Sequence, residues 1–341
     1  MQLTQLVYTL LLAVTLNACK KSSGTDNPPV TTAFFAKGAD ISWVTQMEAS
    51  GYKFYNSAGT AMDCFSLMQS LGLNTIRLRV WVNPSNGWCN NADMVAKAKR
   101  ARQLGLRVLL DIHYSDVWAD PSHQSKPAAW SALDFATLKT TVGSYTKSVL
   151  DTMKQAGVTP SWVQVGNETN DGMLWPDGKA SVNMANFAAL VNAGYQAVKS
   201  VSDTIKVIVH ISNGYDNSLF RWMFDGLKAN GANYDIIGMS LYPTSANWQS
   251  YNASCLTNMN DMVSRYGKPV MICEVGMPVT DAASCQSFIS DLIAKTKSVS
   301  GNNGLGVLYW EPECYNSWQG YGLGAFDNSG KPTVAMSAFA N

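Results

Sequence analysis

The sequence predicts an α/β fold, a (β/α)8 barrel (TIM barrel) formed by a single domain. Short apolar segments alternate along the chain with amphipathic helical segments. Such alternation is typical of a parallel sheet whose faces are covered by helices. Eight strand segments follow one another, which favours a closed barrel over an open doubly wound sheet. No glycine-rich nucleotide-binding loop follows the first strand segment, so the main nucleotide-binding alternative is excluded.

Each predicted strand is an apolar run bounded by turn-forming or helix-ending residues. In chain order the strand segments are 35–41, 74–80, 107–112, 161–167, 205–211, 235–241, 269–274 and 305–310. Helical patterns lie between them, for example at 92–104, 135–156 and 184–201, many of them after a polar capping residue. Gly72, Gly105 and Gly157 each follow a helical run and precede a strand segment. This order is that of repeated strand–helix units.

The composition limits the classes of partner. Of the 341 residues, 46% are hydrophobic and 14% are charged, and the net charge is +1. A chain of this size can bury a large core. Nucleic acid and other polyanions are not expected as partners, because their binding sites concentrate lysine and arginine. The 11 tryptophans and 14 tyrosines are a high number, and several fall in loops after strands, where they can stack on sugar rings.

The N-terminal residues indicate export. Residues 5–16 form an apolar stretch too short to span a bilayer, and Leu16-Asn17-Ala18-Cys19 follows it. This resembles a bacterial lipoprotein signal, although a secretory signal with an incidental cysteine is the alternative. We expect a signal peptide at 1–18, a lipidated Cys19, a flexible polar tether at 19–32 and the folded domain at 33–341. The protein would then be an outer-membrane lipoprotein, at the cell surface, that contacts the membrane only through its lipid.

Export also bears on the remaining cysteines. An oxidising compartment permits disulfides, and we expect one or two, with Cys255 and Cys314 as the favoured pair. Cys273 lies inside an apolar strand segment, so we expect it to be a small buried hydrophobe. The others are Cys64, Cys89 and Cys285, and the wide spacing of the set has no zinc-binding signature.

Two strand segments end in a glutamate. WVQVGNE at 162–168 ends in Glu168, and KPVMICE at 268–274 ends in Glu274. A strand can end in a glutamate without any chemical role. Two carboxyl groups at the ends of separate buried strands are, however, what retaining glycoside hydrolysis requires, with the groups about 5–5.5 Å apart. Together with Asn167 and the aromatic residues, they indicate an enzyme that cleaves sugar chains.

The other strand ends are also polar or aromatic, and barrel active sites lie at the carboxyl ends of the strands. Arg77 and Arg79 alternate along one strand, so both point to the same face. Inside a barrel they need carboxylate partners, and the two glutamates are the predicted ones. The remaining strand-end residues are Asp40, Asp111, His113, His210, Tyr242 and Trp310. The two aspartates could simply pair with an arginine or hold loops, and the two histidines could be buried and satisfied, with His113 the better functional candidate.

Several long motifs together resemble glycoside hydrolase family 53, the endo-β-1,4-galactanases. They are GADISWVTQMEASG at 38–51, NTIRLRVWVNP at 74–84, DIHYSDVWADPSHQSKPAAW at 111–130, VQVGNETNDGMLWP at 163–176, ICEVGMP at 272–278, GLGVLYWEPE at 304–313 and GLGAFD at 322–327. The resemblance covers almost all of the chain after the tether. HYSDVWADP is long and unusual, so the signal is specific.

The resemblance implies roles for individual residues. Glu168, after Asn167, matches the acid/base, and Glu274 matches the nucleophile of a double displacement that retains configuration. Asn167 would bind the sugar 2-hydroxyl, and Trp310 would form a platform under the sugar. Arg77 or Arg79, with Tyr242, would keep Glu274 ionised.

The substrate implied is β-1,4-galactan, as in type I arabinogalactan, cut into galactooligosaccharides. Recognition is expected from loop residues, namely Trp81, Trp88, His113, Tyr114, Asp116, Trp118, Trp175 and Trp318. We expect a monomer with no cofactor. Some bacterial members of the family hold calcium in an aspartate-rich loop, but Asp281, Asp291 and Asp327 are scattered here, so no metal is expected.

Two other functions fit parts of the pattern. An endoglycanase acting on mannan, xylan or glucan would keep both glutamates, but would not be expected to carry HYSDVWADP. A surface lipoprotein that only binds glycan would have no reason to keep Glu168 and Glu274 together with Asn167.

Overall fold

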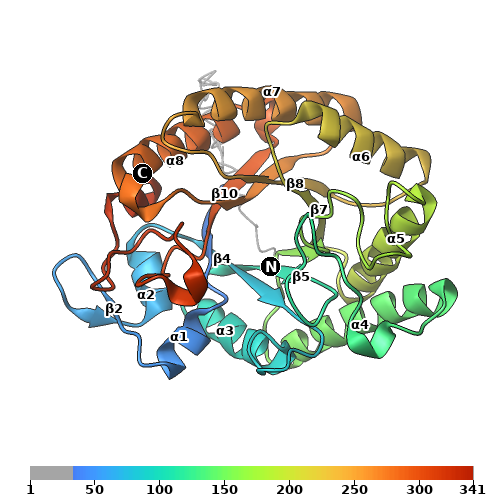
Figure 1. Cartoon of the computed structure of the whole chain (residues 1–341), viewed down its shortest axis with the longest axis horizontal. Coiled ribbons are helices and arrows are strands. Elements are labelled where there is room, and N and C mark those ends of the chain that lie inside the picture. The colour runs from blue at the N-terminus through green and yellow to red at the C-terminus, as the bar shows by residue number, and fades with distance from the viewer. Residues whose placement is uncertain (1–33, 341) are drawn as a thin grey trace, which may run out of the picture. The chain divides into compact units, whose positions relative to one another are not determined.

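Eight parallel strands close into a barrel in the computed structural model, which describes residues 34–340 (Figure 1). They are β1 (Ala36–Asp40), β4 (Thr75–Val80), β5 (Arg107–Ile112), β6 (Trp162–Val165), β7 (Lys206–Ile211), β8 (Ile236–Leu241), β9 (Val270–Val275) and β10 (Gly304–Trp310). Strand β1 pairs with β4 on one side and with β10 on the other, which closes the barrel. The predicted (β/α)8 architecture is confirmed.

Helices surround the barrel (Figure 1). They are α1 (Val44–Ala49), α2 (Cys64–Ser70), α3 (Asn91–Gln103), α4 (Phe135–Gln155), α5 (Met184–Val201), α6 (Asn217–Ala229), α7 (Trp248–Tyr266) and α8 (Ala282–Lys297). Several begin after a polar side chain that accepts a hydrogen bond from a backbone N–H of the first turn, as predicted. These caps are Asp63, Asn90, Asp134, Asn183 and Asp216.

Two local features differ from the prediction. A short hairpin of β2 (Phe54–Tyr55) and β3 (Ala61–Met62) precedes α2 and has no counterpart among the predicted strands. Strand β6 ends at Val165, two residues before the predicted end at 167. Gly166 has a φ of +88°, and this left-handed conformation turns the chain out of the strand before Asn167.

Apolar and polar residues divide the interior of the barrel along its axis. Buried apolar side chains from successive strands form a separate cluster that includes Leu109, Trp162, Ile208 and Met271. Buried polar residues follow further along the strands, towards their carboxyl ends. They include Asp40, Arg77, Arg79, Asp111, Gln164, His210, Ser240 and Glu274. Burying so many polar groups costs free energy unless they pair with one another, so this end of the barrel is where a site is expected.

The predicted disulfides are wrong for the described cysteines. Cys64, Cys89, Cys255, Cys273, Cys285 and Cys314 are all free and buried. Cys255 on α7 packs near Gly214, whereas the Cys314 sulfur lies 4.0 Å from the Met47 sulfur. Each behaves as a small core residue, the role predicted for Cys273.

The predictions for the N-terminus lie outside the described residues. They are the signal peptide at 1–18, the lipidated Cys19 and the tether at 19–32. Among the helices of residues 34–340, none combines the length and the apolar character that a membrane crossing requires.

Candidate active site

A sharp turn after β6 places Asn167 and Glu168. Gly166 has a φ of +88° and Glu168 a φ of +42°, a left-handed conformation that is uncommon for a residue with a side chain. The backbone N–H of Thr169 donates to the His210 carbonyl at 2.8 Å, and Gln124 Nε2 donates to the Asn167 carbonyl at 2.8 Å. These bonds hold a strained backbone, as is common where side chains must be aimed at a substrate.

Arg77 on β4 is the centre of the buried polar network. Its guanidinium contacts Asp40 at 2.7 Å, Asp111 at 3.0 Å, Gln164 at 2.8 Å, Asn167 at 2.8 Å and Glu274 at 2.8 Å. The partners come from β1, β5, β6, the turn after β6, and β9. A single arginine therefore fixes side chains from five parts of the barrel, which only a planar, permanently charged fork of N–H donors can do.

Glu274 at the end of β9 is held by two donors. Arg77 Nη2 lies 2.8 Å from one carboxylate oxygen, and the Tyr242 hydroxyl donates to the other at 2.7 Å. Arg77 and Tyr242 thus make the contacts predicted for them. Both donors favour the ionised form of Glu274.

The two glutamates interact with each other. Burial raises the pKa of Glu168 and of Glu274, and the charge of Glu168 raises the pKa of Glu274 further. Two carboxyl groups whose charges repel each other do not both ionise readily, so the pair retains a proton towards neutral pH. Arg77 and Tyr242 hold Glu274, while the Ser240 side chain lowers the pKa of Glu168 against the larger effect of burial.

His210 on β7 is fully buried. Its Nδ1 is 2.9 Å from Gln164 Nε2 and 3.0 Å from Asn167 Oδ1, and its Nε2 is 2.8 Å from the Ser240 hydroxyl. Burial, and then the charge of Arg77, lower the pKa of His210 well below its ordinary value. His210 is therefore a neutral supporting residue, without the exposure that substrate contact needs.

His113 is also buried and has a defined tautomer. Its Nδ1 accepts the Trp81 indole N–H and the Ala119 backbone N–H, each at 3.1 Å, so Nε2 carries the proton and faces Asp111 at 2.8 Å. Burial opposes ionisation of Asp111, but the charge of Arg77 and the hydrogen bond from His113 Nε2 outweigh burial and lower the pKa of Asp111. The strand ends of β4 and β5 are thus joined by His113 and Asp111.

Arg79 has a different partner from the one predicted. It does not join Arg77 on the two glutamates but pairs with Glu311, the residue that follows β10, and its Nη1 is 4.0 Å from Asp40 Oδ1. The Arg79 guanidinium also lies 4.9 Å from the Trp43 ring centroid and 4.5 Å from that of Trp118. Barrel closure sets this pairing, because β10 and β1 bring Glu311 to the end of β4 nearest Arg79.

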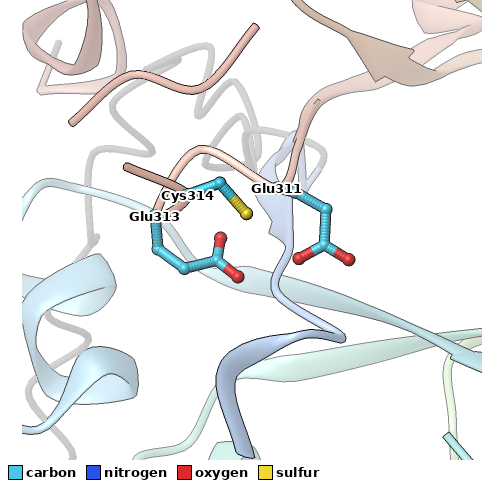
Figure 2. A group of neighbouring side chains, drawn as sticks. All are labelled: Glu311, Glu313 and Cys314. Atoms are coloured by element: carbon cyan, nitrogen blue, oxygen red, sulfur yellow. The ribbon is translucent and has the colours of Figure 1, made fainter. Parts of the chain in front are cut away.

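A second buried acidic group lies beyond Arg79. Glu311, Glu313 and Cys314 each place a potential ligand atom within 4.8 Å of the others, and Figure 2 shows the Glu313 carboxyl directed between Cys314 and Glu311. Glu311 accepts from Arg79 and from the Trp43 backbone N–H. Neither Glu313 oxygen meets a donor among the described residues, and burial and then the charge of Glu311 raise the pKa of Glu313 well above its ordinary value. Glu311 and Glu313 therefore fit a carboxyl pair that shares a proton beside Arg79.

Aromatic residues line a cavity of about 380 Å³, and three of them, Trp43, Trp81 and Trp118, pack on the Arg79 guanidinium. Its lining consists of Trp43, Trp81, Trp118, Trp310 and Tyr321, with Gln46, Asn86, Gln319 and Gly320. The Trp118 ring lies 5.8 Å from that of Trp310 and 5.0 Å from that of Trp81, measured between centroids. The structure therefore brings together three of the predicted aromatic residues in a surface suited to a sugar ring.

Some predicted recognition residues lie elsewhere. Tyr114 is fully buried and its hydroxyl lies 2.6 Å from that of Thr146, so its predicted contact with substrate is wrong. Trp318 packs on Tyr52 and is not part of the cavity lining, so its predicted role stays a prediction.

The remaining predicted loop residues stand apart from the aromatic cavity. Both Asp116 oxygens accept backbone N–H groups, from Asn83 and Ala128, so Asp116 ties two loops together. The Trp175 indole N–H donates to the Asp171 carbonyl at 2.8 Å. Trp88 is half-buried and is not part of the cavity lining.

Sequence reasoning missed several residues of the site. Gln164 and Ser240 are polar residues inside strands that are otherwise almost entirely apolar, a signal that could have been used. Glu311 follows Trp310 directly, so the rule that found the other strand-end residues applied to it too. Trp43 and Tyr321 lie in loops and had no comparable signal.

A larger groove of about 630 Å³ lies between α4 and α5 on the outside of the barrel. It is lined by residues of these two helices, such as Lys139, Gly143 and Asn192, and includes no member of the polar network. The buried polar residues lie at the carboxyl ends of the strands instead.

Comparison with known proteins gives a consistent result. The model of Glycosyl hydrolase family 53 matches residues 36–339. A probable arabinogalactan endo-β-1,4-galactanase A from Neosartorya fischeri is 37% identical over 298 residues, which cover 81% of this chain and 83% of that protein. An arabinogalactan endo-β-1,4-galactanase from Thermothelomyces thermophilus is 31% identical over 328 residues, 89% of this chain and 98% of that protein. A solved structure of a fungal β-1,4-galactanase superposes with a TM-score of 0.84 at 30% identity and covers 91% of this chain and 100% of that one.

Proposed function

This chain belongs to glycosyl hydrolase family 53, and on that premise we propose that it is an endo-β-1,4-galactanase. It hydrolyses internal β-1,4-galactosidic bonds of galactan and type I arabinogalactan and releases galactooligosaccharides. The observation that carries the proposal is the pair of Glu168 and Glu274 at the ends of separate strands of the barrel, with Glu274 held by Arg77 and Tyr242.

The reaction is a double displacement. The Glu274 carboxylate attacks the anomeric carbon while Glu168 gives its proton to the glycosidic oxygen, so the bond to the leaving sugar breaks and a glycosyl ester forms on Glu274. Glu168, now ionised, removes a proton from water. The water oxygen bonds to the anomeric carbon, the ester bond to Glu274 breaks, and the sugar leaves with its configuration retained.

The supporting residues divide between the two glutamates. Arg77 and Tyr242 orient Glu274 and keep it ionised, since each donates to one of its oxygens. Asn167 uses one amide hydrogen on the Ala119 carbonyl, and its oxygen accepts from Arg77, so its second amide hydrogen is available for the sugar 2-hydroxyl. That bond tightens as positive charge develops on the ring in the transition state.

The aromatic cavity holds the sugar chain. Trp310, at the end of β10, forms the platform beside the cleavage point, and Trp118 and Trp43 extend it. Galactose has an axial 4-hydroxyl, so a β-1,4-linked chain is curved and suits tilted rings better than a flat row of them. The centroid-to-centroid arrangement of Trp43 and Trp310, with an interplanar angle of 58°, is of this kind.

A product profile tests the proposal. Linear β-1,4-galactan is incubated with the protein beside mannan, xylan and mixed-linkage glucan, with Glu274→Ala as the control. Short galactooligosaccharides from galactan alone, absent with the variant, are expected. Cleavage of another backbone would show a different β-glycanase, and binding without cleavage would show a glycan-binding protein.

We propose further that the protein is an exported, monomeric lipoprotein of the outer membrane, anchored through Cys19. The support is the apolar segment 5–16 followed by Leu16-Asn17-Ala18-Cys19. In a bacterial host that processes such signals, the wild-type protein should incorporate labelled fatty acid and sediment with membranes, whereas Cys19→Ser should do neither. Light scattering of residues 33–341 should give the mass of one chain.

A further inference from the structure

Arg79 on β4 is a buried cation that leaves most of its hydrogen-bonding capacity unused. Its Nη1 pairs with Glu311 and lies 4.0 Å from Asp40 Oδ1. Its Nε and Nη2 are buried, and neither meets a hydrogen-bond acceptor among residues 34–340. A buried donor without an acceptor costs free energy, so another attractive partner must compensate at this place.

Three tryptophan rings face the Arg79 guanidinium in place of those acceptors. The guanidinium carbon lies 4.5 Å from the ring centroid of Trp118, 4.9 Å from that of Trp43 and 5.3 Å from that of Trp81. All three distances are within the ~6 Å at which the negative face of an aromatic ring attracts a cation. This attraction is strongest where water is excluded, and the Arg79 side chain is only 1% exposed.

The three rings come from separate loops at the carboxyl end of the barrel. Trp43 follows β1, Trp81 directly follows β4, and Trp118 lies in the loop after β5. The Trp118 ring packs edge-on against the other two, with centroid distances of 5.4 Å to Trp43 and 5.0 Å to Trp81. Arg79 therefore lies where three loops meet, and the rings of Trp43, Trp81 and Trp118 form one tryptophan wall around it.

Trp118 depends most on this arrangement. Trp81 has a further support, because its indole N–H donates to His113 Nδ1 at 3.1 Å. The Trp118 side chain is half-buried and has no hydrogen bond to any other residue in the described part of the chain. The orientation of the Trp118 ring is therefore set by packing on neighbouring rings and by Arg79.

Glu311 fixes Arg79 from the other side. One Glu311 oxygen pairs with Arg79, and the other accepts the Trp43 backbone N–H at 3.1 Å. Glu311 also directly follows Trp310 in the chain. The Trp310 ring lies 5.3 Å from that of Trp43 and 5.8 Å from that of Trp118, measured between centroids. The ion pair thus connects the tryptophan wall to the ring that carries the sugar beside the cleavage point.

We propose that Arg79 is a positioning residue for substrate binding, which holds the tryptophan wall in place as one side of the sugar-binding cavity. The inference rests on the proposed function, because it assigns the wall to the sugar chain of that reaction. All three rings line the cavity of about 380 Å³, whereas Arg79 is not part of the lining. Arg79 therefore acts on the sugar chain through the rings, and not on the chemistry of the two glutamates.

The effect on the wall can be measured without substrate. Arg79→Lys keeps a charge for Glu311, but an ammonium is a point charge that cannot replace a planar group facing three rings. In ¹⁵N-tryptophan-labelled protein, hydrogen exchange of the Trp81 indole N–H should quicken at least about tenfold in this variant, because the ring loses the cation that holds it. Trp81→Phe assigns the signal.

The Trp162 indole, at the start of β6 and in the separate apolar cluster, is the internal reference for global stability. Trp162→Phe assigns its signal, and its exchange rate should change much less than that of Trp81. An unchanged ratio of the two rates in Arg79→Lys would overturn the proposal.

The effect on substrate is measured by chain length. Galactan occupies several sugar sites, whereas an activated aryl β-galactoside occupies the one at the cleavage point. In Arg79→Lys, the KM for galactan should rise about tenfold while kcat changes less than about threefold, because the loss is in binding along the chain. The kcat/KM for the aryl galactoside should stay within about twofold of the wild-type value. Equal losses on both substrates would show a general structural defect and overturn the proposal.

Two further variants complete the test. Arg79→Met combined with Glu311→Gln removes both charges of the buried pair, so neither is left uncompensated, and it should show the same increase in KM. Arg100→Met is the matched control, since Arg100 also pairs with carboxylates and lies 4.4 Å from a ring, that of Phe65, but is not part of the cavity lining. It should keep the wild-type KM, and an equal increase in the control would overturn the proposal. If the wild type does not cleave galactan, only the proposed function is refuted, because the exchange measurement still decides whether Arg79 holds the wall.

Discussion

Arg77 Nη2 lies 2.8 Å from Glu274 Oε1, although their strands, β4 and β9, are not neighbours in the barrel. The contact crosses the inside of the barrel at the carboxyl end of the strands. The same guanidinium also faces Asp40 and Asp111, so three acidic groups share one cation. Because these charges are buried, removal of any one leaves the others without full compensation.

Arg77→Lys should lose most activity and much stability. An ammonium is a point charge and cannot replace a fork that reaches five partners. Breaking a buried ion pair costs about 3–5 kcal/mol, and we expect unfolding in urea to show a loss of this order and kcat/KM to fall at least about 100-fold. Arg221→Lys, at an exposed pair with Asp261, is the matched control and should change stability by less than about 1 kcal/mol. Similar losses in both variants would contradict the central position of Arg77.

Azide should distinguish the two glutamates. In Glu168→Ala the acid/base is missing but Glu274 can still form the ester from an activated aryl galactoside, and azide should then release a β-galactosyl azide. In Glu274→Ala, azide enters directly at the opposite face and should give the α-azide. Proton NMR of the products identifies the anomer. The reverse pattern would exchange the assigned roles, and full activity on galactan in either variant would remove that residue from catalysis.

Activity should persist to a higher pH than an ordinary carboxyl group would allow. Burial raises the pKa of Glu168 above its ordinary value of 4.5, and the acid is competent only while protonated. The kcat/KM for galactan should therefore be lost as the pH rises through this raised pKa. A profile from pH 4 to 9 at constant ionic strength checks this, and an alkaline limb near pH 4.5 would refute it.

The Glu311–Glu313 pair should make stability depend on pH. Burial raises the pKa of Glu313 above its ordinary value of 4.5, so the folded state binds a proton that the unfolded state releases. Its contribution is fully present below pH 4.5 and is lost as the pH rises towards the folded pKa. The glutamine in Glu313→Gln cannot ionise. The free energy of unfolding of this variant, relative to that of wild type, should therefore rise by about 1 kcal/mol or more between pH 5 and pH 8.5.

Glu311→Gln should change stability in the opposite direction to Glu313→Gln. It removes the carboxylate that faces the buried Arg79, and we expect a loss on the order of 3 kcal/mol in urea at neutral pH. A pH-independent difference between Glu313→Gln and wild type would show that the pair does not hold a shared proton.

Chelation should leave the protein unchanged. A metal at Glu311, Glu313 and Cys314 would need anionic ligands, but burial raises the pKa of the Cys314 thiol as well as that of Glu313. Dialysis against EDTA should alter neither Tm nor galactan hydrolysis. A fall in Tm that calcium or zinc reverses, and that Glu313→Gln abolishes, would instead place a metal at this group.

The cysteines show why some features could not be predicted. Export suggested disulfides, but whether two cysteines pair depends on the distance and direction of their side chains. Cys255 on α7 and Cys314 after β10 pack in different parts of the core, which spacing in the sequence does not reveal. The same holds for Tyr114, whose place in a conspicuous loop motif suggested the substrate, while its ring turns towards Thr146.

The sequence by itself determined the order of strands and helices, because apolar periodicity and caps act locally, and it placed Glu168 and Glu274 at strand ends. It also put Arg77 and Arg79 on one face, since side chains alternate along a strand. Only the tertiary structure decided that Arg77 holds Glu274 while Arg79 holds Glu311. The physical reason is that a buried cation pairs with whichever carboxylate barrel closure brings within reach, and closure joins strands that lie far apart in the chain.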